Sequence, residues 1–168
     1  DSTLQWVYRY SAQGNLLGRF GGPSARLFHP RGLTVFDDDT VALADTGTAR
    51  VALFSPGGEP IGSLGSIGAS PGQLNEPTDV LRDSQGTYFV VEAENDRIQR
   101  LDAAGNPLIQ WTIAPAYAYN GPHMTFGPFG SLLVTESQTD TLLRYAPNGV
   151  LLNQWTEIDS LKLMDPVG

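Results

Sequence analysis

Three carboxylates recur at one position of a repeated pattern and are the first candidates for chemistry. Asp45 ends VALAD, Glu92 ends FVVE and Glu136 ends LLVTE, at spacings of 47 and 44 residues. A ring of carboxylates contributed in this way would bind a cation. The alternative is structural: an acid at a strand end accepts backbone N–H groups of the next loop and pairs with Arg50 or Arg97. We expect the structural role.

Two further groups of residues were considered as metal ligands. The triplet Asp37–Asp39 has the acidity of a calcium loop, which places several oxygens around a turn. The triplet aligns with the turn from Asp83 to Gly86 in the next repeat, which favours a solvated hairpin. His29 and His123 are the only histidines and there is no cysteine, whereas zinc takes three or four protein ligands. We therefore predict no metal site.

The chain shows no catalytic signature. There is no G-x-S-x-G nucleophile elbow and no phosphate-binding loop. We predict no catalytic residue and no cofactor. Calcium or zinc enters only under the alternative hypothesis, in which the chain is a metal-dependent lactonase or lyase with an axial site.

Two small sets of residues are candidates for binding. A proline opens each repeat, at Pro30, Pro77 and Pro122, and the residue after it is expected near the channel mouth. The predicted ligand-facing residues are therefore Arg31, Thr78 and His123. The loop APAYAYNG is aromatic and lies in a connector, so Tyr117 and Tyr119 form a predicted contact patch.

The elements that position these residues follow from an internal repeat. Glycines of four aligned turns, at positions 14, 58, 105 and 149, are spaced by 44, 47 and 44 residues. The opening prolines, continued by Pro166, are spaced by 47, 45 and 44 residues. Together with the acids, three independent markers give one period of about 45 residues, which is typical of a repeat architecture.

Each repeat is predicted to contain four short strands. In the second complete repeat these are residues 78–82, 87–92, 97–102 and 107–112, separated by turn residues. The last of them starts with Pro107, which suits an edge strand because proline has no N–H to donate. Four antiparallel strands per repeat are the pattern of a propeller blade.

The two stretches Leu27–Gly58 and Gly65–Asn106 resemble NHL repeats. In both, a Pro-led strand, an acid-ended strand, a short loop, Arg-Val or Arg-Ile and a Gly turn follow in order. The third repeat departs from this pattern, with Thr141 in place of the arginine. The resemblance implies an all-β fold, a β-propeller of four-stranded antiparallel blades, and it leaves the function open because such propellers serve many roles.

The predicted organisation is a single propeller segment of about three and a half to four repeats. Residues 1–26 form a partial repeat, 27–73, 74–118 and 119–162 form complete repeats, and 163–168 begin another. Propellers close with 4 to 8 blades. The ring would be completed by the head and tail of this chain, by a second copy as a homodimer, or by the remainder of a longer polypeptide; we favour the last two.

Composition excludes several classes of partner. The net charge is −8 with only 10 Lys+Arg, scattered along the chain, which argues against nucleic acid and anionic membrane surfaces. No apolar run approaches the length of a membrane span. Absence of cysteine is compatible with an extracytoplasmic or secreted, bacterial-type protein without determining the compartment. The hypothesis that we prefer is a non-catalytic protein-interaction or ligand-binding scaffold module of a larger protein or assembly.

Overall fold

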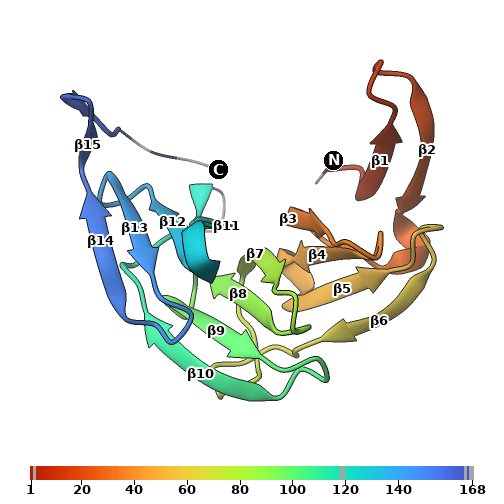
Figure 1. Cartoon of the computed structure of the whole chain (residues 1–168). Coiled ribbons are helices and arrows are strands. Elements are labelled where there is room, and N and C mark those ends of the chain that lie inside the picture. Colours follow the sequence, from red (N-terminus) through yellow and green to blue (C-terminus); the bar gives the residue numbers. More distant parts are fainter. Residues whose placement is uncertain (2, 118–119, 165, 167–168) are drawn as a thin grey trace.

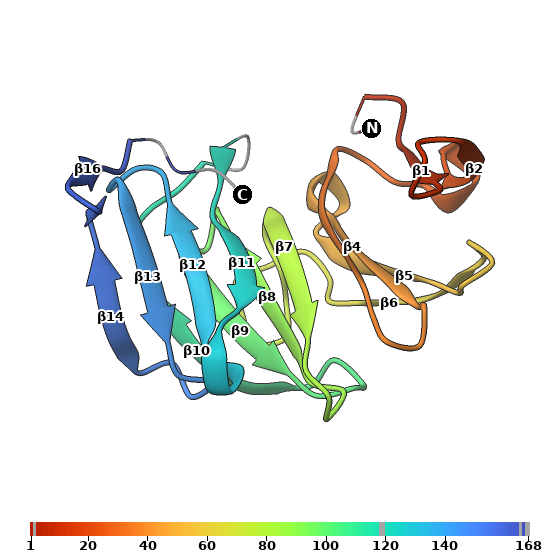
Figure 2. The ribbon, with the colours of Figure 1, turned by 45° about the horizontal axis from the view of Figure 1, so that its top comes forward.

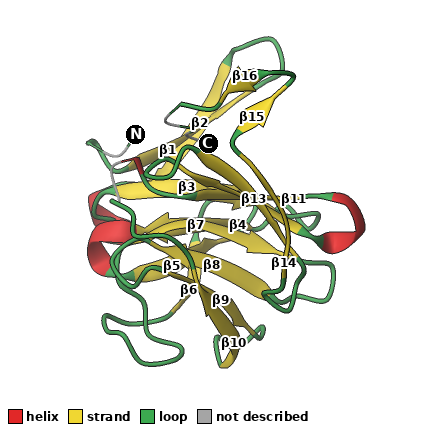
Figure 3. Cartoon of the chain, turned by 90° about the vertical axis from the view of Figure 1, so that its left-hand side faces the viewer, coloured by secondary structure: helices red, strands yellow, loops and turns green. Residues whose placement is uncertain are grey.

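The computed structural model describes residues 1, 3–117, 120–164 and 166, and the chain in these ranges is almost entirely strand and turn (Figure 3). A two-stranded hairpin comes first, made of β1 (Trp6–Tyr10) and β2 (Leu16–Gly21). The first blade contains β3 (Pro30–Val35), β4 (Val41–Asp45), β5 (Arg50–Phe54) and β6 (Pro60–Leu64). The second contains β7 (Pro77–Arg82), β8 (Tyr88–Glu92), β9 (Arg97–Leu101) and β10 (Pro107–Thr112). The third contains β11 (His123–Phe126), β12 (Leu132–Glu136), β13 (Thr141–Tyr145) and β14 (Leu151–Trp155).

Each blade is an antiparallel meander in which every strand pairs with the next one along the chain. The blades stand side by side in an arc, with β3, β7 and β11 on its inner side and β6, β10 and β14 on its outer side (Figures 1 and 2). The arc is open between β14 and the β1–β2 hairpin (Figure 1). This confirms the predicted all-β propeller fold and its four-stranded blades.

Strand position within a blade explains the sequence pattern. Strand β8 is buried along its whole length because it has a strand on each side and a blade against each face, and its sequence is the apolar run YFVVE. Strand β10 starts at Pro107, forms the outer edge and is mostly exposed. The turn before it needs a positive φ, which Gly105 adopts at 87° without steric cost.

The core lies between blades rather than inside them. Phe20 and Phe54 belong to the cluster between the hairpin and the first blade, with ring centroids 5.1 Å apart. Leu74 and Val90 belong to the cluster between the first and second blades, and Phe89 to that between the second and third. Burying apolar area between neighbours is what holds such repeats together, because one blade alone cannot cover its own faces.

Threonine hydroxyls tie the inner strands of neighbouring blades. Thr34 donates a hydrogen bond to the carbonyl of Val80 at 2.6 Å, and Thr46 donates to that of Pro77 at 2.7 Å. Between the second and third blades, Thr78 donates to the carbonyl of Pro122 at 2.8 Å. These bonds fix the spacing of the inner strands, whose facing backbones form no sheet with one another.

The region after β14 differs from the expected pattern. A small hairpin of β15 (Glu157–Ile158) and β16 (Leu161–Lys162) occupies the connection that the repeat assignment left without strands. The helix that the structure describes consists of short 3-10 turns, among them Pro23–Ala25, Thr46–Thr48 and Pro128–Gly130. Among the described residues, none of these is long enough to cross a membrane.

Candidate functional site

The recurring acids Asp45, Glu92 and Glu136, here called the frame acids, are held inside the blades. The Glu92 side chain is fully buried, and its carboxylate accepts four hydrogen bonds. The donors include the backbone N–H of Asn75 at 2.8 Å, Nε of Arg97 at 2.7 Å and Nε2 of Gln99 at 2.8 Å. Its lone pairs are therefore committed to structure.

The other two frame acids repeat this arrangement. Asp45 accepts the N–H of Phe28 at 2.7 Å and pairs with Nε of Arg50 at 2.9 Å. Glu136 accepts the N–H of Ala114 at 3.0 Å, and hydroxyls from Thr139 and Thr141 replace the arginine. Burial first, and the charge of Glu136 second, raise the pKa of Tyr145 to about 12.

The structural role expected for the frame acids is therefore present, with one correction. The backbone N–H groups that they bind lie in the loop before the blade's inner strand, 17 residues earlier for Asp45 and Glu92 and 22 earlier for Glu136. The sequence pattern predicted these donors in the loop that follows the acid. The second strand ends beside the start of the first strand, because the two are antiparallel neighbours, and this brings the earlier loop to the acid.

The three residues that follow the opening prolines occupy different environments. Thr78 is fully buried, and its hydroxyl ties two blades together, so its side chain does not face a ligand. Arg31 is exposed and lines a pocket beside the β1–β2 hairpin. His123 is half-buried and lines a separate pocket on the concave wall, which shares only Leu33 with the first among the lining residues.

The predicted aromatic patch is described in part. The side chain of Tyr117 is 59% exposed in the connector after β10, where a partner would reach it. Tyr119 lies outside the described residues. The tryptophan on the edge strand, Trp111, packs on Tyr145 of the next blade at 5.8 Å between ring centroids.

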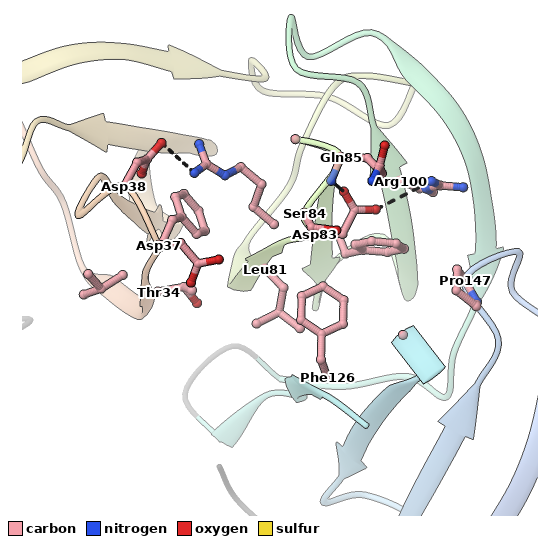
Figure 4. A pocket seen from close by; sticks show the side chains of 16 residues that line it. Thr34, Asp37, Asp38, Leu81, Asp83, Ser84, Gln85, Arg100, Phe126 and Pro147 are labelled. Carbon is pink, nitrogen blue, oxygen red and sulfur yellow. Dashed lines mark hydrogen bonds and ion pairs between the residues drawn. The ribbon is translucent and has the colours of Figure 1, made fainter. Parts of the chain in front are cut away.

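A large groove lies at the end of the blades opposite the opening prolines. We call it the turn-end groove, because the turns joining the two inner strands of the first and second blades line it. Its volume is about 1010 Å³, and all three blades contribute to it (Figure 4). It is lined by residues 34–38, residues 81–86, Phe89, Arg100, Phe126, Gly130 and Pro147.

Two arginines in this groove each contact an aspartate and a phenylalanine ring. Arg82 bonds Asp38 of the first blade at 2.8 Å and lies 4.0 Å over the ring of Phe36. Arg100 lies 3.7 Å from Asp83 and 5.5 Å from the ring of Phe89 (Figure 4). Each arginine therefore lies near an aromatic face while a neighbouring aspartate compensates its charge.

The Asp38–Arg82 pair gives a pH-dependent prediction. Hydrogen bonding from Arg82, followed by that from Thr40, lowers the pKa of Asp38 from 3.8 to about 2. Because the folded state has the lower pKa, the contribution of this pair is present above pH 3.8 and is lost as the pH falls through about 2. We expect Arg82→Gln to raise the Asp38 pKa toward 3.8 in a carboxyl ¹³C titration by NMR.

Asp102 is the matched control for that titration. Its side chain is half-buried, and its pKa is lowered by the side chain and backbone of Asn106, which Arg82 does not touch. Arg82→Gln should leave the Asp102 pKa where it is. An Asp38 pKa that stays near 2 in the variant would contradict the assignment of Arg82 as the main cause.

Sequence reasoning missed the turn-end groove. Its signal was the alignment of the triplet Asp37–Asp39 with the turn Asp83–Gly86, which placed two acidic turns at one end of neighbouring blades. Nothing in the sequence indicated that Phe126 of a third blade would stand 5.9 Å from the Phe89 ring. Within the described parts of the chain, no cluster of three or more His, Cys, Asp or Glu side chains is arranged to hold a metal ion.

No known protein-family model matches the chain. Among solved structures, it is similar to a streptogramin B lyase, with a TM-score of 0.69 and 17% identity over 92% of this chain and 48% of the other. It is similar to a catalytically inactive variant of virginiamycin B lyase from Staphylococcus aureus with quinupristin, with a TM-score of 0.68 and 16% identity over 95% and 50%. It is also similar to the Pan2 WD40 domain of Neurospora crassa, with a TM-score of 0.64 and 11% identity over 90% of this chain and 44% of the other.

These similarities establish the fold. The matched lyases and the WD40 domain are 11–17% identical to this chain. At such identities, proteins share the β-propeller scaffold without sharing a function. The chain spans about half the length of the structures that it matches. In the residues that the structure describes, it is therefore a β-propeller scaffold of three four-stranded blades and two two-stranded hairpins.

Proposed function

We propose that this chain is a non-catalytic binding module that takes a protein segment or ligand in the turn-end groove. The observation that carries the proposal is the groove itself, which crosses all three blades and has a volume of about 1010 Å³. That volume is at the upper end of the range for small-molecule sites, about 300–1,000 Å³. A peptide segment, whose side chains can contact successive blades, fits this extended groove better than a compact metabolite does.

The composition of the groove supports a protein partner. Arginine and aromatic residues are enriched at the centres of protein interfaces. Phe126 is 36% exposed in the groove, and Phe129, in the turn that also supplies Gly130, is 99% exposed. A phenylalanine left in water at the rim of a groove is an available anchor for a partner.

The use of the frame acids argues against the alternative, a metal-dependent lactonase or lyase. All three carboxylates accept backbone and side-chain donors inside their blades, so their oxygens are already engaged in hydrogen bonds. Metal ligation would require breaking these bonds. Elemental analysis of chain incubated with calcium and zinc and then desalted tests this: about one equivalent of retained metal would overturn the non-catalytic proposal.

We further propose that the repeats, residues 27–73, 74–118 and 119–162, are NHL-like and that their ring is completed by the remainder of a longer polypeptide or by a second copy. The arc of blades has open strand edges, which soluble proteins normally cover. An extracytoplasmic, bacterial-type protein remains part of this proposal. The basis for ring completion is the sequence pattern together with a match that covers about half of the similar solved structure.

Light scattering across a range of concentrations tests ring completion. A dimer of defined mass is expected if a second copy closes the ring, and concentration-dependent association without a defined mass is expected if other blades of a longer chain do so. A monomer that stays soluble at every concentration would contradict both routes and would mean that head and tail close a small ring. Leu108→Arg, an exposed outer-strand change on β10 of the second blade, serves as a control that should alter none of these outcomes.

A further inference from the structure

The turns that join the two inner strands of the blades share one backbone geometry and differ in chemistry. In each, the N–H before the turn donates to the carbonyl after it, at 2.9 Å from Phe36, 2.9 Å from Asp83 and 2.7 Å from Gly127. The enclosed residues are three aspartates at 37–39, Ser, Gln and Gly at 84–86, and Pro, Phe and Gly at 128–130. The rim of the turn-end groove therefore changes from acidic through neutral polar to apolar across the blades.

Both ends of this rim stay open when a blade has neighbours on both sides. The second blade packs against the first on one face and against the third on the other, and its turn residues Ser84 and Gln85 are nevertheless exposed. Asp37 holds the position of Ser84 in the first blade, and Phe129 holds that of Gln85 in the third. A further blade or a second copy that completes the ring would therefore leave Asp37 and Phe129 accessible.

Asp37 gives the first-blade end of the groove its charge. Arg82 pairs with Asp38, and Arg100 pairs with Asp83. Asp37 also lines the groove and is exposed, and within the described residues no hydrogen bond or ion pair engages its carboxylate. One negative charge of the described lining is therefore uncompensated, in a chain whose net charge is −8. A positively charged side chain is the electrostatic complement of this end.

The third blade supplies the apolar end of the groove. It contributes Phe126, Gly130 and Pro147 to the lining, and none of these is charged. Phe129, which precedes Gly130, is 99% exposed and has a φ of 59°, a backbone region that bulky residues rarely adopt. An outlier of this kind, at a ring that gains nothing from packing in the free chain, points to a contact with another molecule. An aromatic side chain is the natural partner of such rings.

The two ends of the groove are two blades apart. Packed sheets lie about 10 Å from one another, so the first and third turns are separated by about 20 Å. An extended peptide rises about 3.3 Å per residue and covers that distance in about six residues. Figure 4 shows Leu81 between Asp37 and Phe126, and its buried side chain gives the middle of the groove an apolar floor.

We propose that the turn-end groove selects an extended peptide segment that carries a basic and an aromatic side chain about six residues apart. The basic side chain pairs with Asp37, and the aromatic side chain packs on Phe126 and Phe129. The residues between them cross Leu81. This inference rests on the proposed binding function, and it adds the chemistry of the partner and the placement of that partner across the blades.

Selection from a random peptide library displayed on phage tests the proposal. We expect the enriched peptides to carry Lys or Arg and Phe, Tyr or Trp about six residues apart. An enriched peptide is then synthesised, and its Kd is measured by titration calorimetry. Norleucine in place of its basic residue should weaken binding by about fivefold at most, as for an exposed ion pair. Alanine in place of its aromatic residue should weaken binding about tenfold.

Two variants of the chain separate the two contacts. Asp37→Asn should weaken the synthesised peptide by about fivefold at most and leave the norleucine analogue unaffected, because that analogue already lacks the ion pair. Phe129→Ala should weaken the peptide about tenfold and leave the alanine analogue nearly unaffected. Glu94→Gln and Ile61→Ala are the matched controls, an exposed acid and an exposed apolar side chain outside the groove, and neither should change the affinity.

Several outcomes would overturn this inference. They are enriched peptides that are acidic, enriched peptides that lack one of the two anchors, and peptides that bind both variants as well as they bind the original chain. Peptides without a basic residue that lose affinity only in Phe129→Ala would also overturn it, while leaving the groove as a binding site. A library that yields no peptide above background would contradict the proposed function itself, so the two failures are distinguishable.

Discussion

Glu92→Gln should lower the free energy of unfolding by about 3–5 kcal/mol, the range found when one partner of a buried ion pair is removed. The amide keeps the size of the side chain but leaves the Arg97 guanidinium, whose side chain is only 7% exposed, without a countercharge. It also turns an NH₂ group toward donors such as the N–H of Asn75, which then lose their acceptor. Urea unfolding followed by tryptophan fluorescence measures the change.

Glu94→Gln is the control for this experiment. Glu94 lies two residues further along the chain and is exposed, so the same change in charge and shape should alter the free energy of unfolding by less than about 0.5 kcal/mol. Similar losses of unfolding free energy in the two variants would show that the Glu92 network contributes no more to stability than a surface charge does. A large loss for Glu92 alone would assign the frame acids to the stability of the blade.

Phe89→Ala should destabilise the chain by about 3–5 kcal/mol, the usual cost of truncating a buried phenylalanine. The ring is 1% exposed, belongs to the apolar cluster between the second and third blades, and packs edge-to-face on Phe126 at 5.9 Å between centroids. Its removal leaves a cavity between two blades that are held together by few backbone bonds. Because Phe89 also lines the turn-end groove, the variant should widen the groove as well.

Phe129→Ala removes the same ring from the surface. Phe129 is 99% exposed, so the free energy of unfolding should change by less than about 0.5 kcal/mol. Any loss of partner binding in this variant would then report contact rather than stability. If Phe89→Ala were as mild as Phe129→Ala, the interface between the second and third blades would not be a source of stability.

Local patterning was enough to define the blades. The Gly turns, the opening prolines and the acid that ends each second strand recur at one period, and each marker has a local physical cause: positive φ, an edge without an N–H, and a carboxylate at a strand end. Strand limits expected at residues 97–102 and 107–112 are found at Arg97–Leu101 and Pro107–Thr112. The pairing of acids with Arg50 and Arg97 was also predictable, because antiparallel register places them opposite one another.

The sequence by itself therefore determined the fold class, the strand order and the structural role of the frame acids, all of which depend on neighbours within about one repeat. Only the tertiary structure decided which side chains meet across blades. Thr78 and His123 hold the same repeat position, yet one is buried against Pro122 and the other opens to a pocket. The turn-end groove unites residues of three blades, among them Asp38 and Arg82, which are 44 positions apart. Their distances are set by how closely whole blades pack, which no local pattern encodes.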